Sequence, residues 1–109
     1  MLLCRRPSHK RHGGLWEFPG GKLEPHETLL DAVRRELLEE LQVRATSVGE
    51  PLFTCQDPGS AFVIEFVEVM AEGEPAALEH EEVRWVTVAE ANRLQLAPAD
   101  EAFVKSCGN

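Results

Sequence analysis

The sequence predicts an α/β fold, with one domain in which a mixed β-sheet lies between helices. Strand-like and helix-like segments follow one another along the chain, as expected when helices cover a sheet. The clearest of them is an amphipathic helix beginning near Thr28. The chain has 109 residues, 43% of them apolar, so it can build one modest core, and we assign residues 1–109 to a single domain.

The first half of the chain contains a predicted strand, a loop and the main helix. Leu2 to Cys4 is typical of the end of a strand, and residues 7–14 form a loop rich in charge, histidine and glycine. Thr28 and Asp31 form a variant of the capping box, which starts the helix. The helix is expected to bury a stripe of four aliphatic residues, namely Leu30, Val33, Leu37 and Leu41.

The second half of the chain is expected to supply most of the strands. Residues 52–55 and 61–70 are predicted strands joined by a turn at 57–59, and residues 83–86 form another. The segment 61–70 is apolar on both faces except for two glutamates, which predicts an inner strand covered on both sides.

Two short helices are predicted after the last strand. Thr87 and Glu90 form a capping box at the start of the first helix. Pro98 and Asp100 open the second, which is expected to end near Gly108.

Charge and cysteine content narrow the classes of partner and compartment. The net charge of −8 argues against a nucleic-acid polymer as a partner, because binding such a backbone needs a basic surface. Small phosphate ligands remain possible, because the basic residues are not spread evenly along the chain. Arg5, Arg6, Lys10 and Arg11 all precede the first acid, Glu17. Three isolated cysteines suggest neither a disulfide framework nor a zinc site, and they favour a cytoplasmic location. No apolar run approaches the roughly 20 residues of a membrane span.

An acidic cluster on the main helix is the most informative feature of the sequence. Glu36, Glu39 and Glu40 are spaced at i, i+3 and i+4, so they share one helical face. Their mutual repulsion is most readily explained by bound cations, and Mg²⁺ prefers carboxylate oxygens and substrate phosphates. A plain solvated acidic face is the alternative. Arg35 and the preceding glycine pair at Gly20 favour the metal site.

A longer pattern around this cluster resembles the signature of the Nudix hydrolase family. The matching positions are Gly21, Glu27, Arg35, Glu36, Leu37, Glu39, Glu40 and Val43. Gln42 stands where the family has glycine, and we expect it to cost on the order of 1 kcal/mol at a left-handed helix cap. Residues 16–22 also look like the MutT branch, whose members are nucleoside triphosphate pyrophosphohydrolases.

The resemblance implies a fold, a metal set and a positioning residue. The fold is the Nudix α/β/α sandwich with a mixed sheet. The implied metal is Mg²⁺, with Mn²⁺ as an alternative, and Arg35 would orient the carboxylates. The implied ligands are the carbonyl of Gly20, the carboxylates of Glu36, Glu39 and Glu40, and one acid from outside the helix, for which Glu79 is preferred to Glu81 and Glu82 because it lies six residues before Trp85.

The resemblance also implies substrate contacts. Arg6 and Arg11 would approach the triphosphate, although a surface loop is an equal alternative for Arg11. Asp100 would read the edge of the nucleobase, with helix capping as the rival role. The pocket is expected to be lined by Glu17, Phe18, Pro19, Gly20 and Lys22. The two tryptophans are expected in the core or pocket wall, and the four histidines, His9, His12, His26 and His80, are expected at the surface.

The activity implied by the resemblance is Mg²⁺-dependent cleavage of a nucleoside triphosphate into the monophosphate and pyrophosphate. The MutT likeness favours 8-oxo-dGTP and a role in cleaning the nucleotide pool, which would protect DNA. A CTP or modified pyrimidine nucleotide pyrophosphohydrolase is the enzymatic alternative. A non-catalytic nucleotide-binding module with the same fold is the alternative from another class.

The start of the chain leads to a further expectation. Members of the MutT branch usually begin with a strand upstream of the segment that resembles Met1 to Arg6. We therefore expect a sandwich that lacks the usual first strand and has an exposed sheet edge. A chain of this kind is expected to be a monomer or homodimer that is poorly stable or associates.

Overall fold

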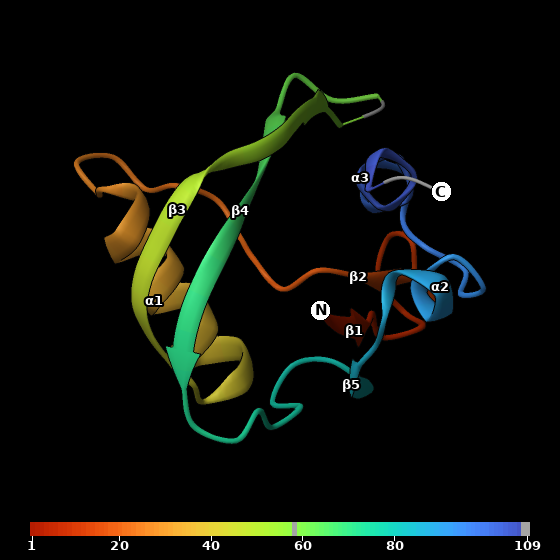
Figure 1. Cartoon of the computed structure of the whole chain (residues 1–109), viewed down its shortest axis with the longest axis horizontal. Coiled ribbons are helices and arrows are strands. Elements are labelled where there is room, and N and C mark those ends of the chain that lie inside the picture. Colours follow the sequence, from red (N-terminus) through yellow and green to blue (C-terminus); the bar gives the residue numbers. More distant parts are fainter. Residues whose placement is uncertain (58, 108–109) are drawn as a thin grey trace.

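Eight elements make up the computed structural model, which describes residues 1–57 and 59–107 (Figure 1). In chain order they are β1 (Leu2–Arg5), β2 (Trp16–Glu17), α1 (Leu29–Leu41), β3 (Arg44–Gln56), β4 (Val63–Glu72), β5 (Glu82–Trp85), α2 (Val88–Ala91) and α3 (Pro98–Ser106). The α/β fold is thereby confirmed. Pro58 of the predicted turn and Gly108 lie outside the described residues. No helix in the described ranges is long and apolar enough to cross a membrane.

The strands form two small sheets. One has the order β2-β1-β5, in which β1 pairs antiparallel with both neighbours. The other is the antiparallel hairpin β3–β4. An isolated parallel bridge between Trp16 and Leu96 gives the otherwise antiparallel strand pairing a mixed, parallel and antiparallel, character. The mixed sheet that the sequence predicts is therefore divided within the described residues, and its parallel component is this single bridge.

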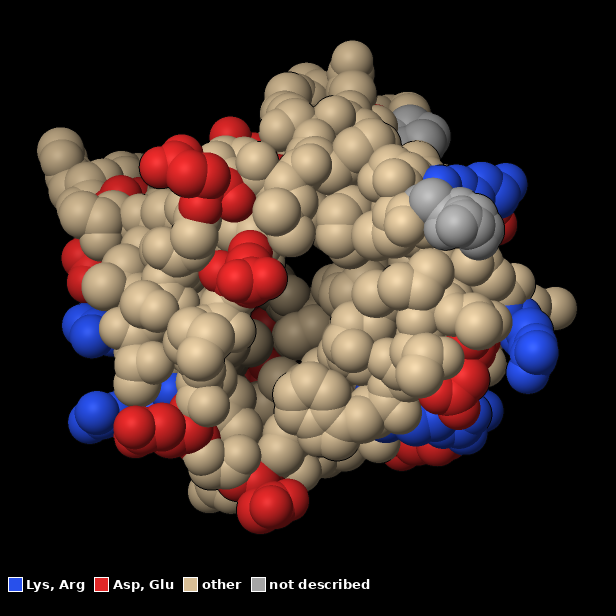
Figure 2. Space-filling model, viewed as in Figure 1, with Lys and Arg blue, Asp and Glu red and all other residues tan. Residues whose placement is uncertain are grey.

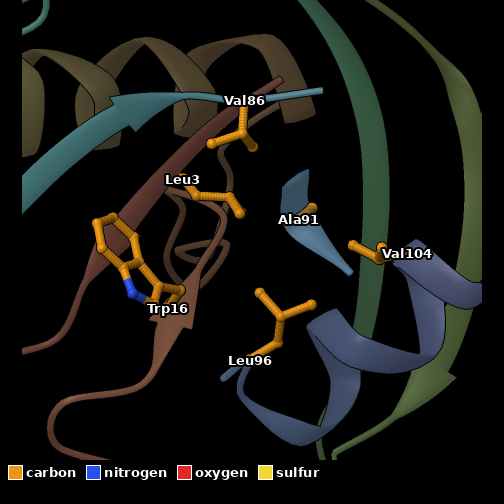
Figure 3. Packing of buried hydrophobic residues seen from close by; sticks show 6 residues of the cluster. All are labelled: Leu3, Trp16, Val86, Ala91, Leu96 and Val104. Atoms are coloured by element: carbon orange, nitrogen blue, oxygen red, sulfur yellow. The ribbon is translucent and has the colours of Figure 1, made fainter. Parts of the chain in front are cut away.

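Consecutive residues of β1 face opposite sides of the sheet, which creates the α/β/α layering. Leu3 faces the side of α2 and α3, in a cluster completed by Trp16, Val86, Ala91, Leu96 and Val104 (Figure 3). Cys4 faces the side of α1, in a cluster completed by Leu37, Leu41, Val43 and Ala45. Both residues are fully buried, as expected of a central strand with cover on each face.

The hairpin β3–β4 differs from the sequence-based expectation. The prediction that residues 61–70 form an inner strand is wrong, because β4 pairs only with β3 among the described strands and buries only Phe66. Val63 and Met70 are 63% and 61% exposed. An apolar run is compatible with a covered strand but does not supply the cover. Here both faces of β4 are covered only in part, with Phe66 packed toward α3 and Val69 toward α1. Trp85, expected in the core or pocket wall, is likewise 68% exposed.

Four aromatic rings attach this hairpin to the rest of the molecule. Phe66 of β4 stacks on Phe103 of α3, with ring centroids 4.7 Å apart and planes 6° apart. Phe18, just after β2, meets both rings edge-on. Phe53 of β3 completes the cluster with centroids 6.0 Å from Phe66 and 5.9 Å from Phe103. Phe53 and Phe66 are already partners in the β3–β4 pairing, whereas the contacts with Phe18 and Phe103 join the hairpin to elements with which it shares no strand pairing.

Both ends of α1 are fixed as the sequence predicts. The hydroxyl of Thr28 accepts a hydrogen bond from the backbone N–H of Asp31 at 3.1 Å. Gln42 ends the helix in the left-handed region, with φ 60°, and its N–H donates to the carbonyl of Leu38 at 3.1 Å. The capping box at Thr87 and Glu90 is also confirmed, with hydrogen bonds in both directions. The placement of α1 matters most, because it carries the acidic cluster.

Candidate active site

Arg35 organises the first part of the site by contacting three groups. Its guanidinium donates to both carboxylate oxygens of Glu27, each at 2.9 Å, and to Oε1 of Glu36 at 2.6 Å. It also donates to the carbonyl of Lys22 at 3.0 Å. The hydrogen bonds from Arg35 lower the pKa of Glu27 to about 2. Residues 22–27 are thus tied to α1, and the carboxylate of Glu36 has a fixed orientation.

Gly21 lies directly against Glu36. A Cβ atom built at Gly21 would overlap the carboxylate of Glu36, whereas one built at Gly20 would meet nothing within 4 Å. The backbone of the turn therefore approaches the acid more closely than any residue with a side chain allows. This contact explains why the second glycine of the pair is needed here, without appeal to a special φ angle.

Glu40 is the most perturbed acid of the cluster. Its side chain is 9% exposed, and Oε2 has no hydrogen-bond partner among the described residues. Burial raises its pKa to about 8, with further contributions from the nearby carboxylates of Glu36, Glu79 and Glu17. Removing a carboxylate from water without a partner is costly. The position is therefore poised to accept a cation.

Glu39 has a different environment from the other two acids of α1. Its side chain is 58% exposed and lies 4.0 Å from Arg35, whereas that of Glu36 is 17% exposed. The shared helical face thus brings Glu36 and Glu40 together and leaves Glu39 at the rim. Helical spacing fixes the direction of each Cα–Cβ bond, but neighbouring elements decide which side chains they cover.

The segment before β5 brings further acids to the site. The N–H of Ala76 donates to the carbonyl of Leu41 at 2.9 Å, and that of Leu78 donates to the carbonyl of Glu40 at 3.2 Å. These bonds use free carbonyls at the end of α1 and hold the segment beside Glu40. Of the three candidate acids, Glu79 acts on Glu40, while Glu81 and Glu82 pair with the nearby arginines Arg5 and Arg84.

Glu17 connects the acids to the rest of the site. Both its oxygens accept hydrogen bonds from Nη1 of Arg6 at 3.1 Å, and Oε2 lies 3.0 Å from Nε2 of His80. The same His80 nitrogen is 3.8 Å from Oε1 of Glu40. The expectation that His80 lies at the surface is wrong, because its side chain is 5% exposed. The spacing of histidines in the sequence gives no sign of this contact.

A cavity of about 360 Å³ adjoins these groups. It is lined by Arg6, Arg11, Glu17, Lys22 and Asp100 from the predicted set, and also by His12, Asp57, Ser60, Phe62, Ile64, Ala97, Pro98 and Ala99. The volume suits a small organic ligand, and the lining combines cations, acids and apolar groups. Figure 2 shows a hollow near the middle of the drawn face with acidic side chains on its left rim.

A second hollow of about 350 Å³ lies beside Arg34, Leu38 and Arg44. Its lining contains no acid and no residue of the cluster around Glu40. We therefore place the site in the first cavity.

Asp100 lies in the wall of the first cavity and does not cap α3. The N-cap residue of α3 is Ala97, which makes no side-chain hydrogen bond. The alternative prediction that Asp100 caps this helix is therefore wrong. Instead, Oδ1 of Asp100 accepts the N–H of Phe18 at 2.8 Å. Burial raises the pKa of Asp100 to about 6, although the N–H of Phe18 opposes that shift. Its carboxyl group joins α3 to β2 at the edge of the cavity.

Three predicted lining residues lie elsewhere. Phe18 contributes its backbone N–H to Asp100, but its ring belongs to the aromatic cluster. Pro19 and Gly20 are not among the residues that line the cavity. Their backbone leads from β2 to the turn against Glu36. The lining also includes Phe62 and Ile64, which local sequence motifs did not identify because their place depends on the fold of the β3–β4 hairpin.

Comparison with known proteins identifies the family. The profile of the NUDIX domain matches residues 1–107. The chain belongs to the Nudix hydrolase family. It is 40% identical over 111 residues to the CTP pyrophosphohydrolase of Escherichia coli K12, covering 95% of this chain and 82% of that protein. It is 33% identical over 107 residues to the putative 8-oxo-dGTP diphosphatase 2 of Mycobacterium tuberculosis, covering 95% of this chain and 76% of that protein.

A solved structure supports the same assignment for the Nudix fold. A MutT structure from work on Aliivibrio salmonicida and Vibrio cholerae matches with a TM-score of 0.82 and 31% identity, covering 97% of this chain and 82% of that one. The family resemblance and the Nudix sandwich that the sequence implies are thus confirmed.

The residues of this Nudix site fit a small hard cation. The available donors are carboxylate oxygens, and the buried Oε2 of Glu40 lacks a partner within the described part of the chain. The described part of the chain contains no preformed group of three or more His, Cys, Asp or Glu side chains that could hold a metal ion by themselves. Mg²⁺ does not require one, because it usually keeps several waters and binds through one or two carboxylates together with substrate phosphates. The donor set therefore suits Mg²⁺ better than a metal that needs a closed protein cage.

Proposed function

We propose that this Nudix hydrolase is a Mg²⁺-dependent nucleoside triphosphate pyrophosphohydrolase, which releases a nucleoside monophosphate and pyrophosphate. The observation that carries the proposal is the position of Glu17. This residue lines the cavity and is also linked through His80 to the buried Glu40. The acids that fit a cation are therefore connected, through His80 and Glu17, to the wall of a cavity with the volume of a small organic ligand.

The acids of α1 and the segment before β5 would hold the cation. Glu36 and Glu40 are the first candidates, Glu79 adds a third carboxylate, and Glu39 at the rim and the carbonyl of Gly20 remain proposed ligands. Bound there, Mg²⁺ would neutralise charge on the phosphate oxygens during hydrolysis. Mn²⁺ has the same preference for oxygen donors and is proposed as a substitute.

The cavity residues would bind and orient the rest of the nucleotide. Arg6, Arg11 and Lys22 line one part of it and are suited to the polyphosphate. Asp100 can accept hydrogen bonds from an amino or imino group of a base. Arg35 would not touch the substrate, but it fixes Glu36 and the turn at Lys22. Positioning of this kind supplies much of the catalysis in phosphate chemistry.

Two substrates are proposed for first tests, 8-oxo-dGTP and CTP. Guanine and cytosine derivatives both carry amino groups that Asp100 could bind. The Mycobacterium tuberculosis relative named as an 8-oxo-dGTP diphosphatase supports the first, and the Escherichia coli CTP pyrophosphohydrolase, with its higher identity, supports the second. Hydrolysis of 8-oxo-dGTP would imply a role in cleaning the nucleotide pool and thereby protecting DNA.

The direct experiment incubates the purified protein with Mg²⁺ and a panel of nucleoside triphosphates, and assays phosphate and pyrophosphate separately. We expect pyrophosphate release that requires the metal. Glu40→Gln should reduce the rate by at least about 100-fold, because it removes a charged cation ligand while keeping the side-chain size. Binding of nucleotides without release would instead support the non-catalytic module, and release of phosphate alone would contradict the proposed bond cleavage.

A further inference from the structure

Backbone hydrogen bonds before and after His80 in the sequence fix the position of this residue. Two residues before it, the N–H of Leu78 donates to the carbonyl of Glu40 at 3.2 Å. One residue after it, the N–H of Glu81 donates to the carbonyl of Arg5 at 2.9 Å. The segment therefore spans from the end of α1 to β1, and the ring of His80 enters the interior with 5% of the side chain exposed.

The ring lies between two carboxylates that come from different elements. Its Nε2 is 3.0 Å from Oε2 of Glu17 on β2 and 3.8 Å from Oε1 of Glu40 on α1. Within the described residues, it is the one basic side-chain nitrogen within 4 Å of Glu40. Glu17 has a second partner in Arg6. Without the imidazole, the buried Glu40 and the half-buried Glu17 would have no nitrogen between them.

The two oxygens of Glu40 are in unequal positions. Oε1 is the oxygen near the imidazole, and Oε2 is buried with no hydrogen-bond partner among the described residues. At 3.8 Å the ring is beyond hydrogen-bond distance of Oε1, but a ring nitrogen beside one oxygen of a buried carboxylate favours one orientation of that group and so the direction in which the other oxygen can bind. Mutation of such partners behind a metal ligand typically lowers metal affinity or activity by about 10- to 100-fold.

We propose that His80 is a positioning residue, whose ring fixes the carboxylates of Glu17 and Glu40 relative to each other and leaves Oε2 of Glu40 available for the cation. This inference rests on the proposed metal-dependent function. It assigns His80 no contact with the substrate. His80 also completes a chain of polar contacts that runs from Arg6 in the cavity wall through Glu17 to Glu40.

The test measures Mn²⁺ binding to the nucleotide-free protein by calorimetry, and separately measures kcat and KM with Mg²⁺. His80→Leu keeps much of the volume but removes both ring nitrogens, while His80→Gln keeps an N–H donor near the place of Nε2. We expect His80→Leu to weaken Mn²⁺ binding by about 10- to 100-fold and His80→Gln to stay within about threefold of wild type. His9→Leu, at an exposed position, is the matched control and should bind Mn²⁺ as wild type does.

Several outcomes would overturn the proposal. His80→Leu could bind Mn²⁺ as tightly as wild type, or His80→Gln could lose as much affinity as His80→Leu, which would point to ring packing alone. If the leucine variant does not fold by circular dichroism, His80→Asn replaces it, because its shorter amide cannot reach both carboxylates. A loss in His80→Asn with retention in His80→Gln supports the proposal, and equal affinities overturn it.

Measurements on the wild-type protein show whether a negative result concerns His80 alone or the proposed function as a whole. If wild type binds Mn²⁺ and releases pyrophosphate while the variants match it, only the role of His80 is overturned. If wild type neither binds Mn²⁺ nor releases pyrophosphate, the proposed function fails, and the inference about His80 fails with it.

Discussion

At the scale of single residues, Gly21 has the most restrictive surroundings of the turn before α1, because the carboxylate of Glu36 occupies the place of a side chain. We predict that Gly21→Ala displaces Glu36 and raises the Mg²⁺ concentration needed for half-maximal activity by about tenfold or more. The measurement is a Mg²⁺ titration of the hydrolysis rate. Gly20→Ala is the matched control, since its Cβ would meet nothing within 4 Å, and an equal effect of both changes would contradict the prediction.

Gln42 adopts a left-handed conformation that suits glycine better. Its φ of 60° lies in the region that costs residues with a Cβ atom. We predict that Gln42→Gly increases the free energy of unfolding by about 0.5 to 1 kcal/mol, as measured by urea denaturation. The hydrogen bond from its N–H to Leu38 does not involve the side chain, so activity should be unchanged. A decrease in stability would show that the side chain of Gln42 contributes more than its strain costs.

Residue-level patterns predicted local features well and contacts across elements poorly. The caps at Thr28 and Gln42 follow from neighbouring residues, so the sequence contains the needed information. The positions of His80 and Glu79 depend on hydrogen bonds between the segment before β5 and the end of α1, which no local spacing encodes. Glu27 was matched to the family pattern, but its two bonds to Arg35 required the folded turn.

At the scale of elements, the aromatic cluster of Phe18, Phe53, Phe66 and Phe103 packs the hairpin β3–β4 against α3. Phe66 is 8% exposed and contacts three other rings. We predict that Phe66→Ala lowers the free energy of unfolding by about 3 to 5 kcal/mol, because it leaves a cavity in this junction. Activity at temperatures where the variant remains folded should show a raised KM, since Ile64 on the same strand lines the cavity proposed to bind the substrate.

The same strand offers a control for that change. Met70 lies on β4 with 61% of its surface exposed. Met70→Ala should therefore change the free energy of unfolding by no more than about 0.5 kcal/mol. Chemical denaturation of both variants under the same conditions provides the comparison. Similar losses for the two variants would mean that the junction does not depend on the aromatic rings.

The strands also show where sequence patterns reach their limit. The prediction that Leu2 to Cys4 belong to a strand follows from their apolar character and is confirmed by β1, which the structure covers on both faces. The segment 61–70 has the same apolar character, yet both faces of β4 are covered only in part, and Phe66 alone among the residues of β4 is buried. A period of two identifies a strand and its faces, whereas the presence of a covering layer depends on the whole arrangement.

At the scale of the whole molecule, stability without metal should depend on pH through Glu40. Its pKa is raised from 4.5 to about 8 on folding, so the folded state binds the proton more tightly than the unfolded state does. The resulting stability is fully present below about pH 4.5 and is lost as the pH rises toward about 8. The groups that face this carboxyl group are Glu36 on α1, Glu17 on β2, and Glu79 and His80 in the segment before β5.

We predict that the metal-free protein loses on the order of 1 to 2 kcal/mol of stability between about pH 6 and about pH 8. Asp100, with a pKa of about 6, has largely completed its own effect below this range. Thermal melts in a chelating buffer measure the loss, and Glu40→Gln should remove most of it. Millimolar Mg²⁺ should restore stability to wild type at about pH 8 but not to the variant. An equal pH slope in both proteins would contradict the assignment to Glu40.

The hairpin β3–β4 pairs with no other strand in the described structure, and it contributes Phe62 and Ile64 to the cavity from a part of the chain that carries none of the proposed cation ligands. Part of the cavity wall and the proposed cation ligands are therefore encoded in separate stretches of sequence. Natural drift or laboratory selection in residues 59–64 is therefore expected to reshape the cavity while the proposed cation ligands stay unchanged.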